Sequence, residues 1–313
     1  MAGFFRGTFC DTLPTHRLAG AATMVKSGTC RRLIVIAAMG SSLWSTIVLA
    51  KVVNLTPFTP WNVDYGEKIC TLRRGFGFKE KPSVLIMDRF GPTDNFQLTV
   101  VSDEFKSFEQ GEALFLQFGE QKPRRIETVV PGKAGTKTAT LFFANKSLAE
   151  KIGDGEDEWR PTVTPATEAA VKSITISYYG KQRVFATGPL DKPFAALRAC
   201  TDNLVTTWGL DAKQQASLSR YARPLSSPGR WLNPSDYPAA MLNQGKQALV
   251  NFRLSVDAQG MPSACEVQSS YNDKKFDEVT CAVLMKRARF SPALDAKGAA
   301  VASFYLNTVR WIM

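Results

Sequence analysis

The stretch QALVNFRLSVDAQG (residues 247–260) alternates apolar and polar side chains over most of its length. Successive side chains of an extended chain point to opposite faces, so this alternation predicts a strand with one apolar and one polar face. Residues 257–260 (DAQG) predict the turn that ends it. The apolar face holds Val250, Phe252, Leu254 and Val256, and the polar face holds Asn251, Arg253, Ser255 and Asp257.

The segments around this strand complete a small α+β unit. Residues 239–245 (AAMLNQG) predict a short helix before it, and residues 261–270 (MPSACEVQSS) predict a second strand that returns beside it. Residues 272–290 predict a longer helix, and residues 300–313 (AVASFYLNTVRWIM) predict a closing strand. The order helix, strand, strand, helix, strand indicates a three-stranded antiparallel sheet with two helices on one face.

The longer helix has an apolar stripe with one exception. Phe276, Val279 and Val283 lie within about 60° of one another on a helical wheel. Arg287 projects close to the same stripe, where a charged side chain needs a partner. We therefore expect the stripe to pack on the sheet, with the charged side chain of Arg287 at the border of this apolar contact.

This combination resembles the C-terminal domain of TonB-family proteins. The resemblance rests on YP at 237–238, the alternating strand before a glycine turn, SS at 269–270, a helix ending in RARFSPA (287–293), and VRW at 309–311. It covers about residues 234–313, a quarter of the chain.

The resemblance implies a periplasmic domain that grips an extended segment of an outer-membrane receptor. In that family the segment adds as a strand beside the last strand of the domain, where unpaired backbone groups can be satisfied by a partner. Two alternatives stay open, in which the strand pairs with a second copy or with the preceding part of the chain. The expected docking edge comprises Ala302, Ser303, Phe304, Tyr305, Leu306, Asn307, Thr308, Val309, Arg310 and Trp311.

Two family features are missing from this sequence. The apolar stretch at residues 33–50 contains no histidine, whereas the membrane helix of the family carries one. No Pro-rich spacer precedes residue 234; residues 51–209 read as a folded domain instead. We therefore doubt coupling to the proton-motive-force complex. The alternative function is an envelope scaffold that reuses the domain to bind another extended peptide or the cell wall.

Residues 51–209 predict a β-rich, sandwich-like domain closed by a helix. Short apolar runs separated by turn residues are typical of such folds. Residues 173–188 (SITISYYGKQRVFATG) predict a hairpin, and residues 193–209 predict a helix with a periodic apolar face. Residues 210–236 contain three prolines and many small polar residues, and residues 210–233 are predicted to be a linker.

The first 50 residues predict an export signal. Arg31 and Arg32 precede the apolar run LIVIAAMGSSLWSTIVLA (33–50), which favours cleavage between Ala50 and Lys51. An uncleaved inner-membrane anchor is the alternative, and the true start could be Met24. Both alternatives place the rest of the chain in the periplasm or beyond.

Cysteine use agrees with an oxidising compartment. Four of the six cysteines follow the export signal, and an even number there predicts two disulfides with three connectivities open. Pairing Cys70 with Cys200 would join the closing helix to an early strand. Cys265 and Cys281 would fit a disulfide variant of the domain that this segment resembles.

Composition excludes several classes of function. The single histidine, His16, precedes the export run, so Ser-His or Cys-His catalysis and His-ligated metal sites are not expected after it. The net charge of +11 is dispersed, which argues against nucleic acid. We expect no enzyme, cofactor or metal. The enzyme alternative would use Asp88, Asp103 and Glu104 as acid and base, and nothing pairs them in the sequence.

Overall fold

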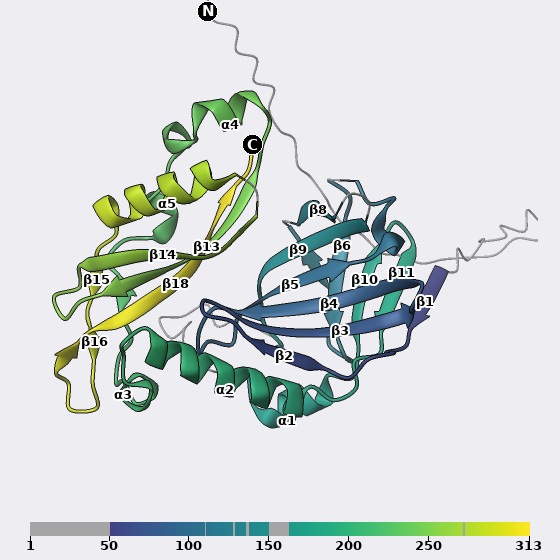
Figure 1. Ribbon diagram of the computed structural model, residues 1–313, viewed down its shortest axis with the longest axis horizontal. Coiled ribbons are helices and arrows are strands. Elements are labelled where there is room, and N and C mark those ends of the chain that lie inside the picture. Colours follow the sequence, from purple (N-terminus) through teal and green to yellow (C-terminus); the bar gives the residue numbers. More distant parts are fainter. Residues whose placement is uncertain (1–50, 110, 128, 136–137, 150–162, 272) are drawn as a thin grey trace, which may run out of the picture. The chain divides into compact units, whose positions relative to one another are not determined.

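The computed structural model describes residues 51–313 with the exception of residues 110, 128, 136–137, 150–162 and 272 (Figure 1). The described residues belong to one compact unit. The expected export signal, including Met24 and Ala50, lies outside them. No helix among the described residues is long and apolar enough to cross a membrane.

Six antiparallel strands form the larger sheet, in the order β2-β3-β4-β5-β9-β8. A tight hairpin joins β3 to β4, because only two residues separate these two strands, whose side chains alternate in burial. The strands are β2 (Asn62–Tyr65), β3 (Cys70–Phe78), β4 (Lys81–Arg89), β5 (Phe96–Val101), β8 (Val130–Ala134) and β9 (Thr138–Lys146).

Five strands form the second sheet, in the order β1-β11-β10-β6-β7. The predicted hairpin is present as β10 and β11, and β1 pairs with β11 in parallel. Its turn is at Tyr179 and Gly180, both with positive φ. The strands are β1 (Lys51–Leu55), β6 (Leu114–Phe118), β7 (Arg124–Ile126), β10 (Ile174–Tyr178) and β11 (Lys181–Phe185), with the 3-10 turn η1 (Asp103–Phe105) after β5.

The two sheets pack face to face around an aromatic core. Phe76 of the larger sheet contacts Phe185 of the smaller one with ring centroids 5.4 Å apart, and Phe96 contacts Phe118 at 6.1 Å. Edge-to-face aromatic pairs of this kind add to the burial of apolar area. The expected β-rich, sandwich-like fold is therefore present.

Helix α2 (Asp191–Thr207) closes the sandwich beside β2 and β3 (Figure 1), with the shorter α1 (Pro165–Ala170) packed against it. Cys200 of α2 forms a disulfide with Cys70 of β3, with their Cα atoms 5.9 Å apart. Phe194 contributes to the aromatic core, with its ring 5.7 Å from that of Phe96.

The segment predicted to be a linker is folded against the C-terminal sheet. It contains α3 (Ala212–Ala216), β12 (Arg223–Pro224) and the 3-10 turn η2 (Pro228–Arg230). Strand β12 pairs with β15 (Phe290–Ser291), and Trp231 is 2% exposed. The segment packs in this way because its apolar side chains, Leu218, Ala222 and Trp231, are buried in the core of the C-terminal part. The boundaries of the two predicted domains stay a prediction.

The C-terminal part is an α+β unit with a three-stranded antiparallel sheet in the order β14-β13-β18. Helix α5 covers one face of this sheet (Figure 1). The elements are η3 (Pro234–Asp236), α4 (Ala239–Asn243), β13 (Ala248–Val256), β14 (Pro262–Tyr271), α5 (Lys274–Arg287), β16 (Ala293–Leu294), β17 (Ala300–Val301) and β18 (Ser303–Trp311).

Two sets of interactions hold α5 in place, one to the sheet and one to the segment before it. Cys281 forms a disulfide with Cys265 of β14. Arg287 donates to the carbonyl oxygen of Trp231 at 2.8 Å and to both carboxylate oxygens of Asp236 at 2.6 and 2.9 Å. The arginine that looked misplaced in the sequence therefore joins the end of α5 to η3.

Candidate docking edge of the C-terminal sheet

Strand β18 is an edge strand of the C-terminal sheet. It pairs with β13 from Ser303 opposite Val256 to Trp311 opposite Ala248. No strand among the described residues pairs with its other side, so the sandwich does not occupy that position as a strand. An unpaired edge offers backbone donors and acceptors to a partner in extended conformation.

Alternate residues of β18 direct their backbone groups toward this open side. The Thr308 amide donates to Oδ1 of Asn307 at 2.8 Å, so it is directed away from β13. In an antiparallel pair the hydrogen-bonding direction alternates along the strand. Phe304, Leu306 and Arg310 therefore share the open side with Thr308, while Tyr305 and Asn307 face β13.

One end of the expected edge is already covered. Gln215 of α3 donates from Nε2 to the carbonyl oxygen of Ala302 at 3.0 Å and accepts from the Ser303 hydroxyl at 2.7 Å. Ala302 also lies outside β18, between β17 and β18. Phe304, Tyr305 and Leu306 are between 3% and 8% exposed, so the accessible part of the expected edge at residues 302–311 runs from Asn307 to Arg310.

The core-facing side chains of β18 hold the strand in place. Tyr305 packs against Phe290 and Trp231 with ring centroids 5.1 and 5.6 Å away. Trp311 donates from Nε1 to the Thr280 hydroxyl of α5 at 3.1 Å. Both side chains are buried, so their packing holds β18 on the sheet.

The opposite face of the sheet contacts residues of the sandwich and its closing helix. The rings of Phe304 and Trp208 lie 5.0 Å apart, and the guanidinium of Arg253 lies 4.5 Å from the Trp208 ring. A Cβ added at Gly91 would lie 2.5 Å from Cδ1 of Leu306, so any larger residue there would require the Leu306 side chain to shift. The polar face predicted from the sequence is therefore largely covered by the preceding part of the chain.

A chain of polar side chains joins the two parts. The Thr71 hydroxyl donates to Asp88 at 2.7 Å, Asn251 donates to Oε1 of Gln97 at 3.0 Å, and Thr308 donates to Oδ1 of Asn251 at 2.7 Å. Burial raises the pKa of Asp88 to about 6, although hydrogen bonds from Thr71 and Gln97 oppose the shift. The polar chain thus runs from a buried carboxyl group to the docking edge.

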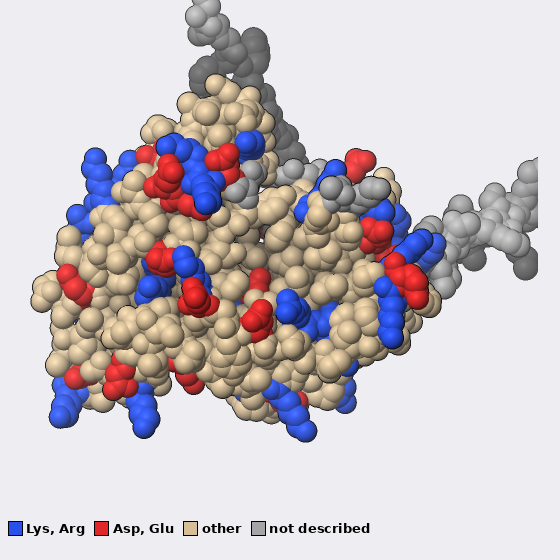
Figure 2. Space-filling view, viewed as in Figure 1, with Lys and Arg blue, Asp and Glu red and all other residues tan. Residues whose placement is uncertain are grey.

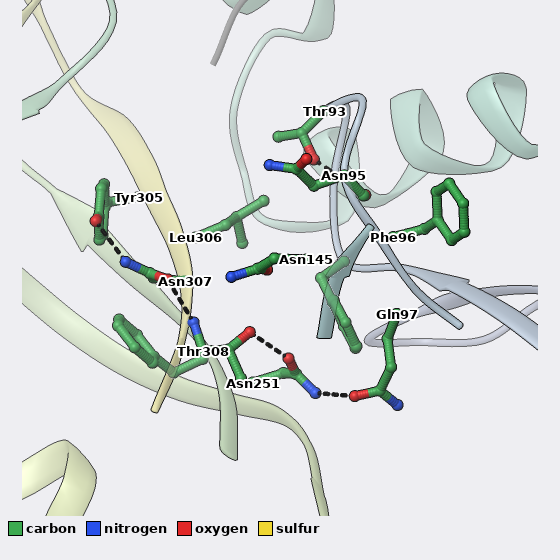
Figure 3. Close-up of a pocket in the computed structure, with 12 residues that line it drawn as sticks. Thr93, Asn95, Phe96, Gln97, Asn145, Asn251, Tyr305, Leu306, Asn307 and Thr308 are labelled. Atoms are coloured by element: carbon green, nitrogen blue, oxygen red, sulfur yellow. Dashed lines mark hydrogen bonds between the residues drawn. The ribbon is translucent and has the colours of Figure 1, made fainter. Parts of the chain in front are cut away.

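A cavity of about 90 Å³ lies where β18 approaches the sandwich. Figure 3 shows Asn307 and Thr308 of β18 on one side, and Asn95 and Asn145 of the sandwich on the other. Carboxamide groups dominate the polar lining, which comprises Thr93, Asn95, Gln97, Asn145, Asn251, Asn307 and Thr308.

The charge near this edge is positive. The pKa of Lys146 is lowered to about 8, first by burial and then by the nearby charges of Arg310 and Arg124. Elsewhere on the face seen in Figure 2, acidic and basic side chains are interspersed rather than gathered in a basic stripe. This distribution fits the dispersed net charge of the sequence.

The carboxylates of the enzyme alternative are engaged in separate local interactions. Asp88 accepts from Thr71 as described, Asp103 pairs with Lys106 at 2.8 Å, and Glu104 pairs with Arg183 at 2.7 Å. In the described part of the chain, no three His, Cys, Asp or Glu side chains gather as a metal site needs.

Residues 233–313 match the family model described as Gram-negative bacterial TonB protein C-terminal. The C-terminal quarter of the chain therefore carries a TonB C-terminal domain, as the resemblance predicted. Members of this family are non-catalytic binding domains of the cell envelope that interact with outer-membrane receptors. No curated protein matches the chain.

Sequence reasoning located β18 but missed the residues opposite it. Asn95 comes from the loop before β5, Asn145 comes from the last residues of β9, and Gln215 comes from the segment predicted to be a linker. The only sequence signal at Asn145 is an asparagine near the end of an apolar run. Asparagine adopts left-handed backbone angles more readily than most residues, and Asn145 has a φ of 49° in the structure. Nothing in the sequence indicated that these residues meet β18.

Proposed function

We propose that this protein binds an extended peptide segment of an outer-membrane receptor by strand addition to β18. In this function it supports TonB-dependent transport from the periplasm. The observation that carries the proposal is the unpaired side of β18, accessible between Asn307 and Arg310, in a domain whose family binds such receptors. Backbone pairing supplies affinity, and alternate side chains supply specificity.

A second candidate function has its own support. The region where a TonB protein has an extended spacer is here a folded sandwich, and β18 lies against it. A polyproline spacer extends by about 3 Å per residue, whereas a folded domain spans far less per residue. This favours a scaffold that binds an extended peptide without transmitting force from the inner membrane.

The test of strand addition is a proline at an outward amide. Thr308→Pro removes an amide that faces the open side of β18 and that donates to Asn307 while no partner is bound. Proline is tolerated in edge strands. The matched control is Thr308→Val, which loses the hydroxyl bond to Asn251 but retains the amide. The probes are ten-residue synthetic peptides that copy the periplasmic N-terminal segments of outer-membrane receptors, titrated calorimetrically against the exported protein.

We expect at least one peptide to bind the wild-type protein, and Thr308→Val to bind the same peptide with similar affinity. Thr308→Pro should bind it at least tenfold more weakly. Circular dichroism of each variant verifies that the domain is folded. Equal affinity of wild type and folded Thr308→Pro would rule out strand addition at this edge. To separate the two candidate functions, receptor-dependent uptake is measured in cells that lack the protein, where the scaffold predicts no loss.

A further inference from the structure

A strand docked on β18 has a second edge, and the structure provides groups that face it. One edge of such a segment would pair with the outward backbone groups of Thr308 and Arg310, with the Thr308 amide leaving Oδ1 of Asn307, at the usual strand spacing of about 4.8 Å. Its other edge would retain unpaired N–H and C=O groups. Across the cavity from β18 lie Asn95 and Asn145 of the sandwich (Figure 3).

These two carboxamides differ from the others that line the cavity. The side chains of Gln97, Asn251 and Asn307 are held by hydrogen bonds to neighbouring side chains. Within the described residues, the side chains of Asn95 and Asn145 have no hydrogen-bond partner. A carboxamide both donates and accepts, so it can pair with the N–H and C=O groups of an extended backbone.

The backbone at Asn145 adds a second observation. Its φ of 49° lies in the left-handed region, which non-glycine residues occupy at a cost in free energy. Asn145 lies inside β9, where the pairing with β5 shifts register, and its exposed side chain lines the cavity beside β18. Asparagine tolerates this conformation better than most residues, and a register shift of this kind can re-aim a side chain next to a functional site.

The cavity size restricts what can pass between the two walls. At about 90 Å³ it is smaller than the roughly 150 Å³ cavity that accommodates a benzene ring. We therefore expect this space to accommodate a small side chain of the segment but not an aromatic one. Leu306 and Phe96 line the same cavity and leave little room for adjustment, because both are buried.

We propose that Asn95 and Asn145 form a second wall of the docking site, which binds the free edge of the partner's extended segment and requires Gly, Ala or Ser where the segment passes them. This inference rests on the proposed function and names the partner's chemistry. The sandwich thereby takes part in recognition, which no property of the TonB C-terminal domain alone supplies.

The experiment compares variants of the exported protein for binding the receptor peptide selected above. Asn145→Gly suits the left-handed backbone and removes only the carboxamide, and Asn95→Ala removes the other. Each is expected to weaken binding about fivefold, the effect of one lost hydrogen bond, and together about 20-fold. Asn243→Ala, exposed on α4, is the matched control and should leave the affinity unchanged.

A second series replaces each peptide position in turn with tryptophan. With wild-type protein, we expect tryptophan at one peptide position to lower the affinity more than tenfold, and tryptophan at the neighbouring positions to have little effect. Asn145→Gly should restore part of the affinity that is lost at that one position. Tolerance of tryptophan at every position would overturn the requirement for a small residue. An unchanged affinity of the double variant would overturn the second wall.

The outcomes separate this inference from the function on which it rests. Loss of binding in Thr308→Pro with no loss in the asparagine variants leaves strand addition standing and removes the second wall. Failure of every peptide to bind wild-type protein overturns both. Weaker binding in the asparagine variants and in Thr308→Pro supports both.

Discussion

Gln97 of the sandwich and Asn251 of the C-terminal sheet are joined by a buried hydrogen bond of 3.0 Å, across 154 positions of sequence. Both side chains are at least 94% buried, so neither can turn to water if its partner is lost. Asn251 also accepts from Thr308 on the docking edge. This contact therefore connects the stability of the whole unit with the geometry of β18.

Replacing Asn251 with alanine should destabilise the protein. The change leaves Oε1 of Gln97 and the hydroxyl of Thr308 without their partner, which costs about 1–3 kcal/mol in the free energy of unfolding. Urea denaturation measures it. Gln244→Ala, an exposed residue after α4, should stay within about 0.5 kcal/mol of wild type. A loss no larger than that of the control would show that the contact is not formed in solution.

The sequence predicted the elements of the C-terminal domain because their signals are local. Alternation of Val250, Phe252 and Leu254 on one face is enough to define a half-buried strand, and these three are buried in the structure. Glycine and cysteine positions marked the turn and the disulfide. The sandwich followed in the same way from short apolar runs.

Long-range partners could not be predicted, because side-chain pairing across more than a hundred positions leaves no periodic signal. Asn251 was assigned to a polar face and is instead 3% exposed. Arg287 looked misplaced until its bonds to Asp236 and Trp231 were seen. The segment before η3 looked like a linker because prolines outweighed its apolar residues, yet Trp231 is buried in the core. The edge strand β18 was predicted in position, but the sandwich residues that face it were not.

Stability should depend on pH through Asp88. Its folded-state pKa of about 6 is raised above the ordinary value of 3.8 by burial. The folded protein therefore binds the proton more tightly than the unfolded chain, and the resulting stabilisation is present below about pH 4 and lost as the pH rises through about 6. The full change is of the order of 3 kcal/mol.

Asp88→Asn isolates this effect, because asparagine has nearly the same shape and does not titrate. The measurement is the free energy of unfolding of both proteins by urea between pH 4 and pH 7.5. The stability of wild type relative to the variant should fall as the pH rises through this range. Parallel curves for the two proteins would contradict the shifted pKa of Asp88.

The two disulfides should contribute unequally to stability, because they close chains of different length. Cys70 and Cys200 are 130 positions apart, whereas Cys265 and Cys281 are 16 apart. The chain-entropy model gives about 5 kcal/mol for the longer loop and about 3 kcal/mol for the shorter one. Paired Cys→Ser variants of each bridge, compared by urea denaturation, should therefore rank in that order, and the shorter bridge should be the more dispensable. The Cys265→Ser and Cys281→Ser pair should still bind the receptor peptide, since neither cysteine lies on β18 and Trp311 still ties β18 to α5. A reversed ranking would mean that residual structure in the unfolded chain, rather than loop length, sets the contribution of these bridges.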